Sequence, residues 1–216
     1  MNIDCYDIIK KRLKNKFDTV FREIACKQGT IHLIFISNLC DSSFISEYII
    51  YPLIKDDDYV YNIKNMKETM LAANSVEEVK DVEEAILGIL SGNVIIIPDF
   101  IEGIISVEAK GFSKRSVGSP VTEAVIKGPR EGFTESIMDN LSLIRRRIKN
   151  ENFEVEKFTL GKESNTLVAM CYLKNKAPEA LTDYIRNKLS KAKFEFVIES
   201  NYIEELLTQK IPFLIL

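Results

Sequence analysis

Residues 19–37 read TVFREIACKQGTIHLIFIS and decide the fold class, because they hold two strand-like runs around a tight turn. Both runs, Thr19–Cys26 and Thr30–Ser37, are rich in β-branched and aromatic residues, and a glycine lies in the Lys27-Gln28-Gly29 segment between them. This combination is typical of a β-hairpin. In the residues that follow, apolar positions recur at helical spacing, which predicts a helix. The hairpin and this helix form a strand–turn–strand–helix unit.

The C-terminal part repeats this pattern. Phe153–Leu160 and Thr166–Leu173 have the composition of paired strands, and a helical segment comes after them. When Thr166 is aligned with Thr30 without gaps, Tyr184 falls on Tyr48. We therefore predict an α/β fold of two small α/β lobes, each with a mixed sheet and packed helices, and the alignment favours a duplication as their origin.

The remaining elements follow from periodicity and from start and stop signals. Ser42 or Ser43 can cap the helix after the first hairpin. The other expected helices span 4–14, 62–73, 82–90, 134–148, 178–189 and 202–207, and the other expected strands span 76–79, 93–98, 103–110 and 194–199.

One segment lacks periodicity. Residues 111–132 are punctuated by glycines and prolines, which predicts a long irregular connection. The expected domains are therefore an N-terminal α/β lobe at 1–110, this connection at 111–132, and a C-terminal α/β lobe at 133–216.

The composition narrows the class of protein. The 29 basic and 32 acidic residues give a net charge of -3, which argues against a nucleic-acid binder. The N-terminus has no apolar core of a secretory signal, and no segment approaches the roughly 20 apolar residues of a membrane span. Taken by itself, the chain is expected to be soluble and intracellular.

Side chains that could support chemistry are scattered. Cys5, Cys26, Cys40 and Cys171 form no Cys-x-x-Cys pair, so we expect no metal site, and mostly buried thiols instead. The one histidine, His32, lies in an apolar run and is expected to be a packed or edge residue. Phosphate-loop and nucleophile-elbow motifs are missing. We therefore predict no catalytic residues, no cofactor and no enzyme activity.

The arginine run at the end of the 134–148 helix has three interpretations. Arg145, Arg146 and Arg147 occupy consecutive helical positions, so they cannot all point at one ligand. They can complement the helix dipole and remain solvated. One or two of them can instead bind carboxylates of another lobe or subunit. The third interpretation is binding of anionic lipid headgroups.

The longest recognisable motif lies in the same region. KGPREGFTE at 127–135 leads into NLSLIRRRI at 140–148. This resembles the signature of the A subunits of GerA-type spore germination receptors, in which a Gly-Pro-Arg-Glu-x-Phe-x-Glu stretch precedes a helix that ends in Ile-Arg-Arg-Arg-Ile. Phe21-Arg22-Glu23, residues 47–53 and residues 202–206 also fit the family.

The resemblance implies the soluble N-terminal domain of a receptor subunit in the spore inner membrane, on the cytoplasmic (core) side. It implies a transporter-like B subunit and a lipoprotein C subunit as partners, and a homo-oligomer. Attachment to the membrane would come through a C-terminal region absent from this chain. Two alternatives stay open: a small-molecule or ion-binding module between the two lobes, and a family member that modulates other germinant receptors.

The motif supplies the candidate contact residues. Gly128 and Pro129 would fix a bend that presents Arg130 and Glu131 before the helix. Phe133 would pack against the helix as a hydrophobic staple. We hypothesise that this segment orients the lobes and passes a conformational change on; the alternative is a plain folding signature. The candidate interlobe or intersubunit contacts are Gly128, Pro129, Arg130, Glu131, Phe133, Glu135, Asn140, Arg145, Arg146 and Arg147.

Overall fold

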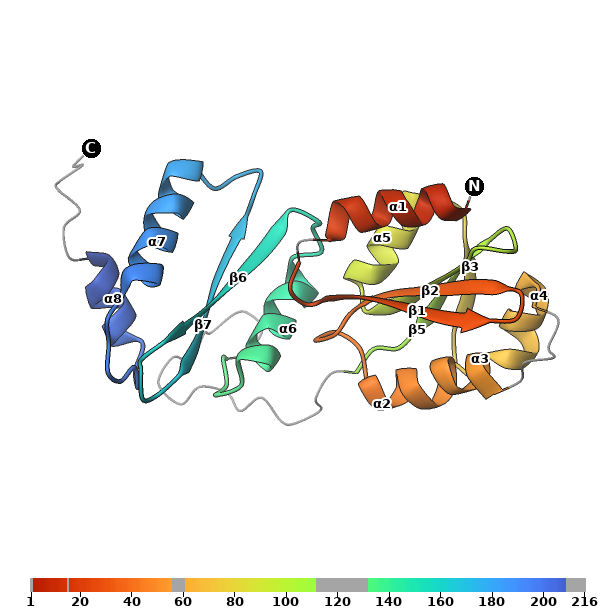
Figure 1. Ribbon diagram of the computed structural model, residues 1–216, viewed down its shortest axis with the longest axis horizontal. Helices are drawn as coiled ribbons and strands as arrows, with labels where there is room; N and C mark the ends of the chain where they lie inside the picture. Colours follow the sequence, from red (N-terminus) through yellow and green to blue (C-terminus); the bar gives the residue numbers. More distant parts are fainter. Residues whose placement is uncertain (1, 15, 56–60, 112–131, 209–216) are drawn as a thin grey trace, which may run out of the picture. The chain divides into compact units, whose positions relative to one another are not determined.

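The computed structural model describes residues 2–14, 16–55, 61–111 and 132–208 (Figure 1). The chain divides into two compact units, residues 1–151 and residues 152–216. The sequence-based division into lobes at 1–110 and 133–216 stays a prediction, because almost all of the connection between them lies outside the described residues.

The first unit is built on a five-stranded sheet with the order β1-β2-β4-β5-β3. All four neighbouring pairs are antiparallel, whereas a mixed sheet was predicted. The α/β class is confirmed; the pairing differs because short turns join β1 to β2 and β4 to β5, and such turns permit only antiparallel neighbours. The strands are β1 (Thr19–Cys26), β2 (Gly29–Ile36), β3 (Val76–Val79), β4 (Asn93–Pro98) and β5 (Ile104–Glu108).

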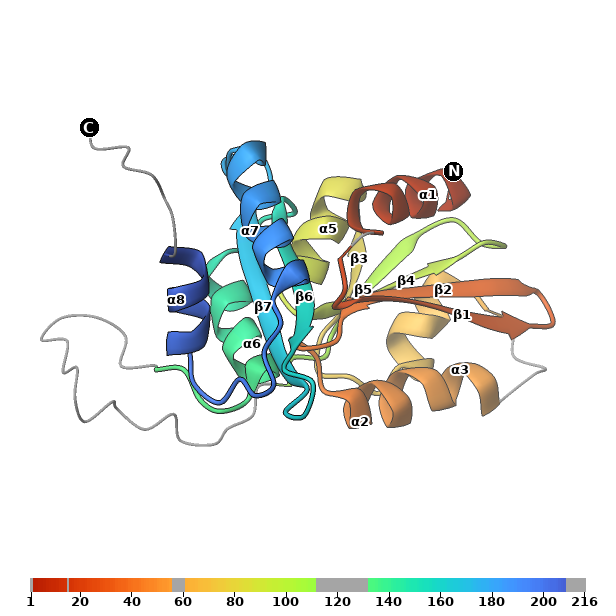
Figure 2. The ribbon, with the colours of Figure 1, turned by 60° about the vertical axis from the view of Figure 1, so that its left-hand side comes forward.

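Helices cover both faces of this sheet (Figures 1 and 2). On one face lie α1 (Asn2–Leu13) and α5 (Val82–Leu90). The other face carries a helix from Ser42 to Lys55, which widens to π-helical geometry in its middle, and a shorter helix from Ile63 to Met70. Their parts are α2 (Ser42–Phe44), η1 (Ile45–Ile50), α3 (Tyr51–Lys55), α4 (Ile63–Asn65) and η2 (Met66–Met70).

The alternation of strand side chains produces two cores. In β2, Ile31 and Leu33 pack toward the helix at 42–55, while Ile34 and Ile36 pack toward α1 and α5. Central strand β4 is apolar on both faces, and Val94 to Ile97 are all fully buried. Burial on both faces explains why this strand reads as a continuous apolar run rather than as an alternating one.

The second unit is an antiparallel hairpin with helices. Strands β6 (Phe153–Leu160) and β7 (Thr166–Leu173) pair along their whole length. Helix α7 (Glu179–Lys191) and helix α8 (Asn201–Thr208) contribute to a buried cluster around Leu160, Leu189 and Val197. The hairpin is followed by a helix in both units, as the aligned segments predicted.

The strand predicted at 194–199 is wrong. This segment has no regular strand geometry, although two of its carbonyls accept bonds from the β6–β7 turn: Lys162 N–H to Phe194 (3.0 Å) and Glu163 N–H to Glu195 (3.0 Å). Val197 bonds to side chains instead, donating its N–H to Ser164 Oγ at 3.0 Å and accepting from Thr166 Oγ1 at 2.6 Å. Side-chain hydroxyls thus take the place of a ladder of backbone bonds.

Single residues of the first unit also differ from expectation. The helix at 42–55 is capped by Asp41, which accepts from the N–H groups of Ser43 and Phe44 at 2.9 and 3.0 Å, rather than by Ser42 or Ser43. The helix begins at Ser42, so the residue before it, Asp41, occupies the N-cap position, and its Oδ1 accepts both bonds. His32 is packed, as predicted, and stacks on the Tyr6 ring at 3.9 Å.

The prediction of mostly buried thiols is wrong. Cys40 is buried, and burial raises the pKa of its thiol to about 12. Cys5 and Cys26 are half-buried, and Cys171 is exposed. Cys171 belongs to a two-stranded sheet, in which a side chain on the face away from α7 does not reach a core.

Candidate functional site

The helix that carries the arginine run is α6 (Ile137–Arg147). Ser136 caps it, because Ser136 Oγ accepts the Asp139 N–H at 3.3 Å. The helix therefore begins three residues after the predicted start at Thr134. Asp139 in its first turn and the three arginines in its last turn match the charges that the helix dipole favours.

Asn140 holds the segment before α6 against the helix. Its Oδ1 accepts the Thr134 N–H at 2.7 Å, and its Nδ2 donates to the Thr134 carbonyl at 2.7 Å. Both backbone groups of one residue are thus satisfied by one side-chain amide. Asn140, one of the candidate motif residues, thus fixes how the preceding segment enters the helix.

Arg145 lies inside the first unit with Asp18. Its Nε donates to Asp18 Oδ2 at 2.6 Å and its Nη2 donates to Asp18 Oδ1 at 2.7 Å. The side chains of Arg145 and Asp18 are 1% and 0% exposed, so this bidentate ion pair is out of contact with water. The Asp18 carbonyl in turn accepts the Ser37 N–H at 2.8 Å, which ties the acid to the end of β2.

The three arginines have different surroundings. Arg145 is buried, Arg146 is half-buried and Arg147 is exposed. This is the divergence expected of consecutive helical positions. The interpretation that the arginines remain solvated does not hold for Arg145, which binds the Asp18 carboxylate. Contacts of Arg146 and Arg147 with another subunit or with lipid headgroups stay predictions.

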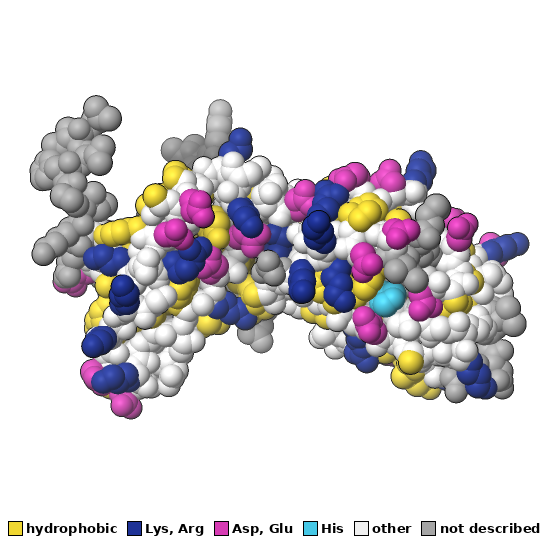
Figure 3. Space-filling view, turned by 45° about the horizontal axis from the view of Figure 1, so that its top comes forward, with side chains coloured by type: hydrophobic (Ala, Val, Ile, Leu, Met, Phe, Trp, Pro, Cys, Tyr) yellow, Lys and Arg dark blue, Asp and Glu magenta, His cyan; other side chains and the backbone are white. Residues whose placement is uncertain are grey.

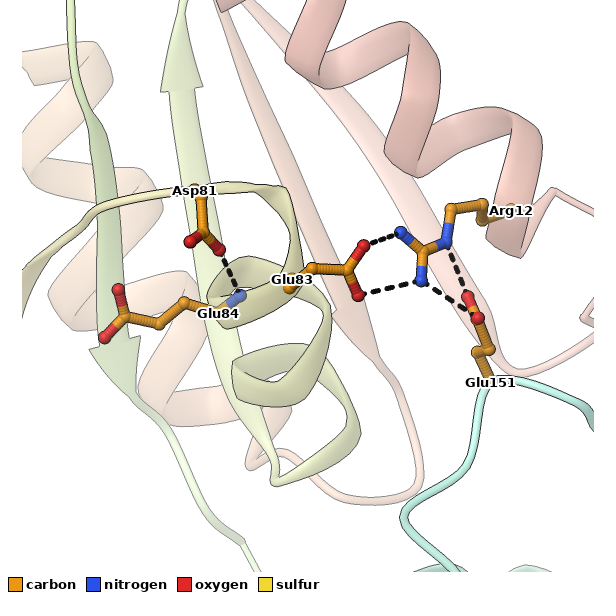
Figure 4. A network of polar contacts seen from close by, with 5 residues as sticks. All are labelled: Arg12, Asp81, Glu83, Glu84 and Glu151. Atoms are coloured by element: carbon orange, nitrogen blue, oxygen red, sulfur yellow. Dashed lines mark hydrogen bonds and ion pairs between the residues drawn. The ribbon is translucent and has the colours of Figure 1, made fainter.

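A second polar network joins helices of the same unit (Figure 4). Arg12 of α1 binds Glu151 through Nε at 2.6 Å and Nη2 at 2.9 Å. The same guanidinium also binds Glu83 in the first turn of α5, with Nη2 to Oε2 at 3.0 Å. Asp81 caps α5 by accepting the Glu84 N–H at 2.8 Å.

These contacts change the ionisation of both partners. Hydrogen bonds from Arg12 lower the pKa of Glu83, and the bonds to Glu83 and Glu151 raise the pKa of Arg12. On the face drawn in Figure 3, basic and acidic side chains of the first unit lie next to one another rather than in separate fields. Glu83, in the first turn of α5, is thus bound by Arg12 of α1.

Phe133 does not form the predicted staple. Its side chain is 72% exposed and borders a hollow of about 280 Å³ that is lined by Leu143, Ile144, Arg147 and Ile148. The staple position is the residue before the N-cap, and because Ser136 is the cap, that residue is Glu135 rather than Phe133. Glu135 is also exposed.

The first four candidate motif residues precede residues 132–208, the part of the chain around α6 that the structure describes. Gly128, Pro129, Arg130 and Glu131 lie outside the described residues, so their suggested bend and contacts stay predictions. The structure brings Asn140 and Arg145 into defined contacts on α6, at opposite ends of the helix.

A second hollow, of about 240 Å³, lies at the C-terminal end of α6. It is lined by Leu39, Leu90, Ser91, Lys110, Arg146 and Lys149. Three of these side chains are cationic and none is a carboxylate. The hollow lies within the first unit, at the C-terminal end of α5.

The described residues offer no obvious metal chemistry. Among them, no three histidine, cysteine or acidic side chains gather closely enough to hold a metal ion. Within the same residues, no helix has the length and apolar character needed to cross a bilayer.

Comparison with known proteins decides the family. A family model described as "Bacillus/Clostridium GerA spore germination protein" matches residues 7–215. The chain belongs to the GerA family. The resemblance that rests on the motif at 127–148 is thereby confirmed.

Relatives within the GerA family agree over most of the chain. Spore germination protein KA of Bacillus subtilis is 34% identical over 203 residues, which is 92% of this chain and 37% of that protein. Spore germination protein B1 of Bacillus subtilis is 26% identical over 219 residues, which is 96% of this chain and 43% of that protein. The chain thus spans less than half the length of these relatives.

A solved structure has the same fold. The N-terminal domain of the A subunit of the Bacillus megaterium spore germinant receptor GerK3 matches with a TM-score of 0.63 and 23% identity. The match covers 94% of this chain and 76% of that one.

Two residues of the GerA-family chain that organise the site were missed from the sequence. Asp18 stands in a stretch of mixed charge, KNKFDT, where an acid is expected to face water. Arg12 lies in the basic end of a short amphipathic helix, where solvation is again the usual outcome. One signal in the sequence could have indicated that Asp18 is buried. Asp18 lies between Phe17 and β1, which is an edge strand of the sheet, and a residue at that position can contact an element that packs against this edge.

Proposed function

We propose that this chain is the N-terminal domain of the A subunit of a spore germinant receptor, and that it acts in receptor assembly and in relay of the nutrient signal. Membership of the GerA family supports the assignment to spore germination. The similarity to spore germination protein KA supports it over nearly the whole chain. The GerK3 domain supports the fold that such a subunit would have.

The observation that carries the relay is the buried pair of Asp18 and Arg145. Arg145 lies in the family motif, and Asp18 precedes β1 of the five-stranded sheet. A displacement of α6 either moves Asp18 with it or separates two charges that have no access to water. Because separation is costly, the helix and the edge of the sheet move as one body. A rigid link of this kind is what a relay element requires.

The partners follow from the same proposal. A transporter-like B subunit and a lipoprotein C subunit complete the receptor, with further copies of this chain beside it. The receptor lies in the spore inner membrane, with this domain on the cytoplasmic (core) side, and the membrane attachment comes from the remainder of the protein.

The experiment targets the part of the motif that leads into α6. Full-length receptors with Arg130→Ala or Glu131→Ala are placed in spores of the organism that encodes them, and nutrient-triggered germination is measured with receptor abundance. We expect slower germination at normal abundance. Lys64→Ala, at an exposed position outside the motif, is the matched control. Germination at the control rate in both motif variants would overturn the relay.

A further inference from the structure

We propose that Arg12 pins the joint, residues 148–152, in which the first unit ends and the second begins, by holding Glu151 on the end of α1. Glu151 is the last residue of the first unit. The inference goes beyond the proposed function and does not depend on it. It rests on which groups of the joint are bonded, and on how firmly Arg12 itself is placed.

The joint is short, and its backbone is bonded at both ends. At its start, the Ile148 N–H donates to the Ile144 carbonyl at 2.9 Å, which continues the bonding of α6 by one residue. At its end, the Asn152 carbonyl accepts the Lys174 N–H at 2.8 Å, and both of these residues belong to the second unit. Residues 149–151 are therefore the part of the joint that these two backbone bonds leave between them.

The side chain of Glu151 is bound within the first unit. Arg12 donates to its Oε2 from Nε at 2.6 Å and to its Oε1 from Nη2 at 2.9 Å (Figure 4). The side chains of Arg12 and Glu151 are 29% and 31% exposed. A bidentate pair of arginine and carboxylate is the geometry in which a partly exposed ion pair adds measurable stability. Glu151 is thus fixed one residue before Asn152, which is bonded within the second unit.

The position of Arg12 is set by the core of the first unit. Ile9 and Leu13 of the same helix are fully buried, so the end of α1 is packed in place. On its other side the guanidinium binds Glu83 in the first turn of α5, with Nη2 to Oε2 at 3.0 Å. A planar guanidinium that binds a carboxylate on each side has little freedom to rotate. Arg12 therefore offers Glu151 a fixed point rather than a flexible tether.

The bond to Glu151 shortens the stretch in which the backbone can bend. Hinges are formed by a few residues at the ends of elements, which absorb changes of φ and ψ. Without this bond, all of residues 149–151 can take up such changes. With it, residues 149 and 150 form a short loop that is held at both ends, and bending is concentrated between Glu151 and Asn152. A displacement of α1 or α6 is then passed on to the second unit rather than absorbed in the joint.

The test measures backbone motion in the 216-residue chain by nitrogen-15 NMR relaxation. Glu151→Ala is compared with the matched control Glu83→Ala, because each substitution removes one of the two carboxylates that Arg12 binds, and Glu83 lies outside the joint. Arg12→Met removes the cation from both. The amide resonances of β4, which is buried in the middle of the sheet, report in each variant that the first unit is folded.

We expect the order parameters of the amides at positions 150 and 151 to fall from about 0.85 to below about 0.6 in Glu151→Ala and in Arg12→Met, and to keep the native value in Glu83→Ala. In the first two variants the rotational correlation time of the second unit should also fall relative to that of the first. If Arg12→Met does not fold, Glu151→Ala decides. The proposal is overturned if Glu151→Ala leaves both quantities unchanged, or if Glu83→Ala lowers them as much as Glu151→Ala does.

Discussion

Asp18 and Arg145 put two opposite charges inside the first unit, where water does not reach either of them. Removing charges from water costs several kcal/mol per ion, and the attraction between them recovers this only when the geometry is good. The two bonds of 2.6 and 2.7 Å meet that condition. The pair is therefore more sensitive to loss of one partner than to loss of both.

Loss of one charge is expected to destabilise strongly. Arg145→Met leaves the Asp18 carboxylate buried without its cation, and should lower the free energy of unfolding by about 3–5 kcal/mol. The double variant Asp18→Leu, Arg145→Met should recover most of that loss, because it buries no unpaired charge. Urea denaturation of the three proteins measures both values. A double variant no more stable than Arg145→Met would contradict this account.

Glu156 in the second unit gives a pH-dependent counterpart. Arg186 donates to it through Nε at 2.7 Å and Nη2 at 2.6 Å, and the Tyr172 hydroxyl donates at 2.6 Å. The bonds from Arg186 hold its pKa below the ordinary value of 4.5, against the opposing effect of partial burial. The folded state therefore favours the ionised form, and this stability is present above pH 4.5 and lost as the pH falls through the lowered pKa.

The prediction compares the native chain with Glu156→Gln. The native chain should be the more stable one at pH 6, and the difference should shrink as the pH falls below 4.5, where Glu156 becomes protonated. Thermal unfolding of both proteins from pH 6 to pH 3 measures the difference. A difference that does not change with pH would show that the ion pair with Arg186 adds no stability.

Among the elements, α6 depends on the side chain of Asn140 for its entry. Asn140→Ala removes both bonds to the backbone of Thr134, and should raise the hydrogen-exchange rate of the Thr134 amide by at least tenfold. Asn140→Asp keeps the acceptor for the Thr134 N–H and loses the donor, so it should give an intermediate rate. Equal exchange of the Thr134 amide in Asn140→Ala and in the native chain would show that Asn140 does not hold the segment before α6.

Local pattern was enough to predict most elements. The bounds of β1, β3, β4, β6, β7 and α5 match the sequence-based ranges, because polar or turn-forming residues delimit each of these segments in the sequence. The segment 194–199 has the same apolar character as those strands, yet it bonds to the side chains of Ser164 and Thr166. The residue composition of a segment does not show whether another strand has backbone N–H and C=O groups available to pair with it.

The site was less predictable than the elements. Asn140 and Arg145 were singled out through the motif, but their partners Thr134 and Asp18 were not. The bond to Thr134 is local, whereas Asp18 is separated from Arg145 by 127 residues. No local pattern links residues at such a distance, and a charged side chain is usually exposed, so a buried ion pair is the contact that sequence reasoning is least able to find.

On the scale of the whole molecule, the two units differ in how well their strands are buried. Ile95 and Ile96 of β4 are fully buried in the middle of five strands, while β7 has half-buried and exposed side chains and only one partner strand. We expect the amides of β4 to exchange with solvent far more slowly than those of β7. Native-state hydrogen exchange measures both, and β7 amides as slow as those of β4 would contradict the expectation.

The distance along the chain between Asp18 and Arg145 also bears on synthesis at the ribosome. Asp18 emerges early, but its cation follows 127 residues later, which at ~5–20 residues per second is a delay on the order of ten seconds. During that interval the nascent sheet carries a solvated carboxylate at one edge. The first unit is thus completed only when α6 has been made, and a chain that ends before Arg145 lacks the cation that pairs with the buried Asp18 carboxylate.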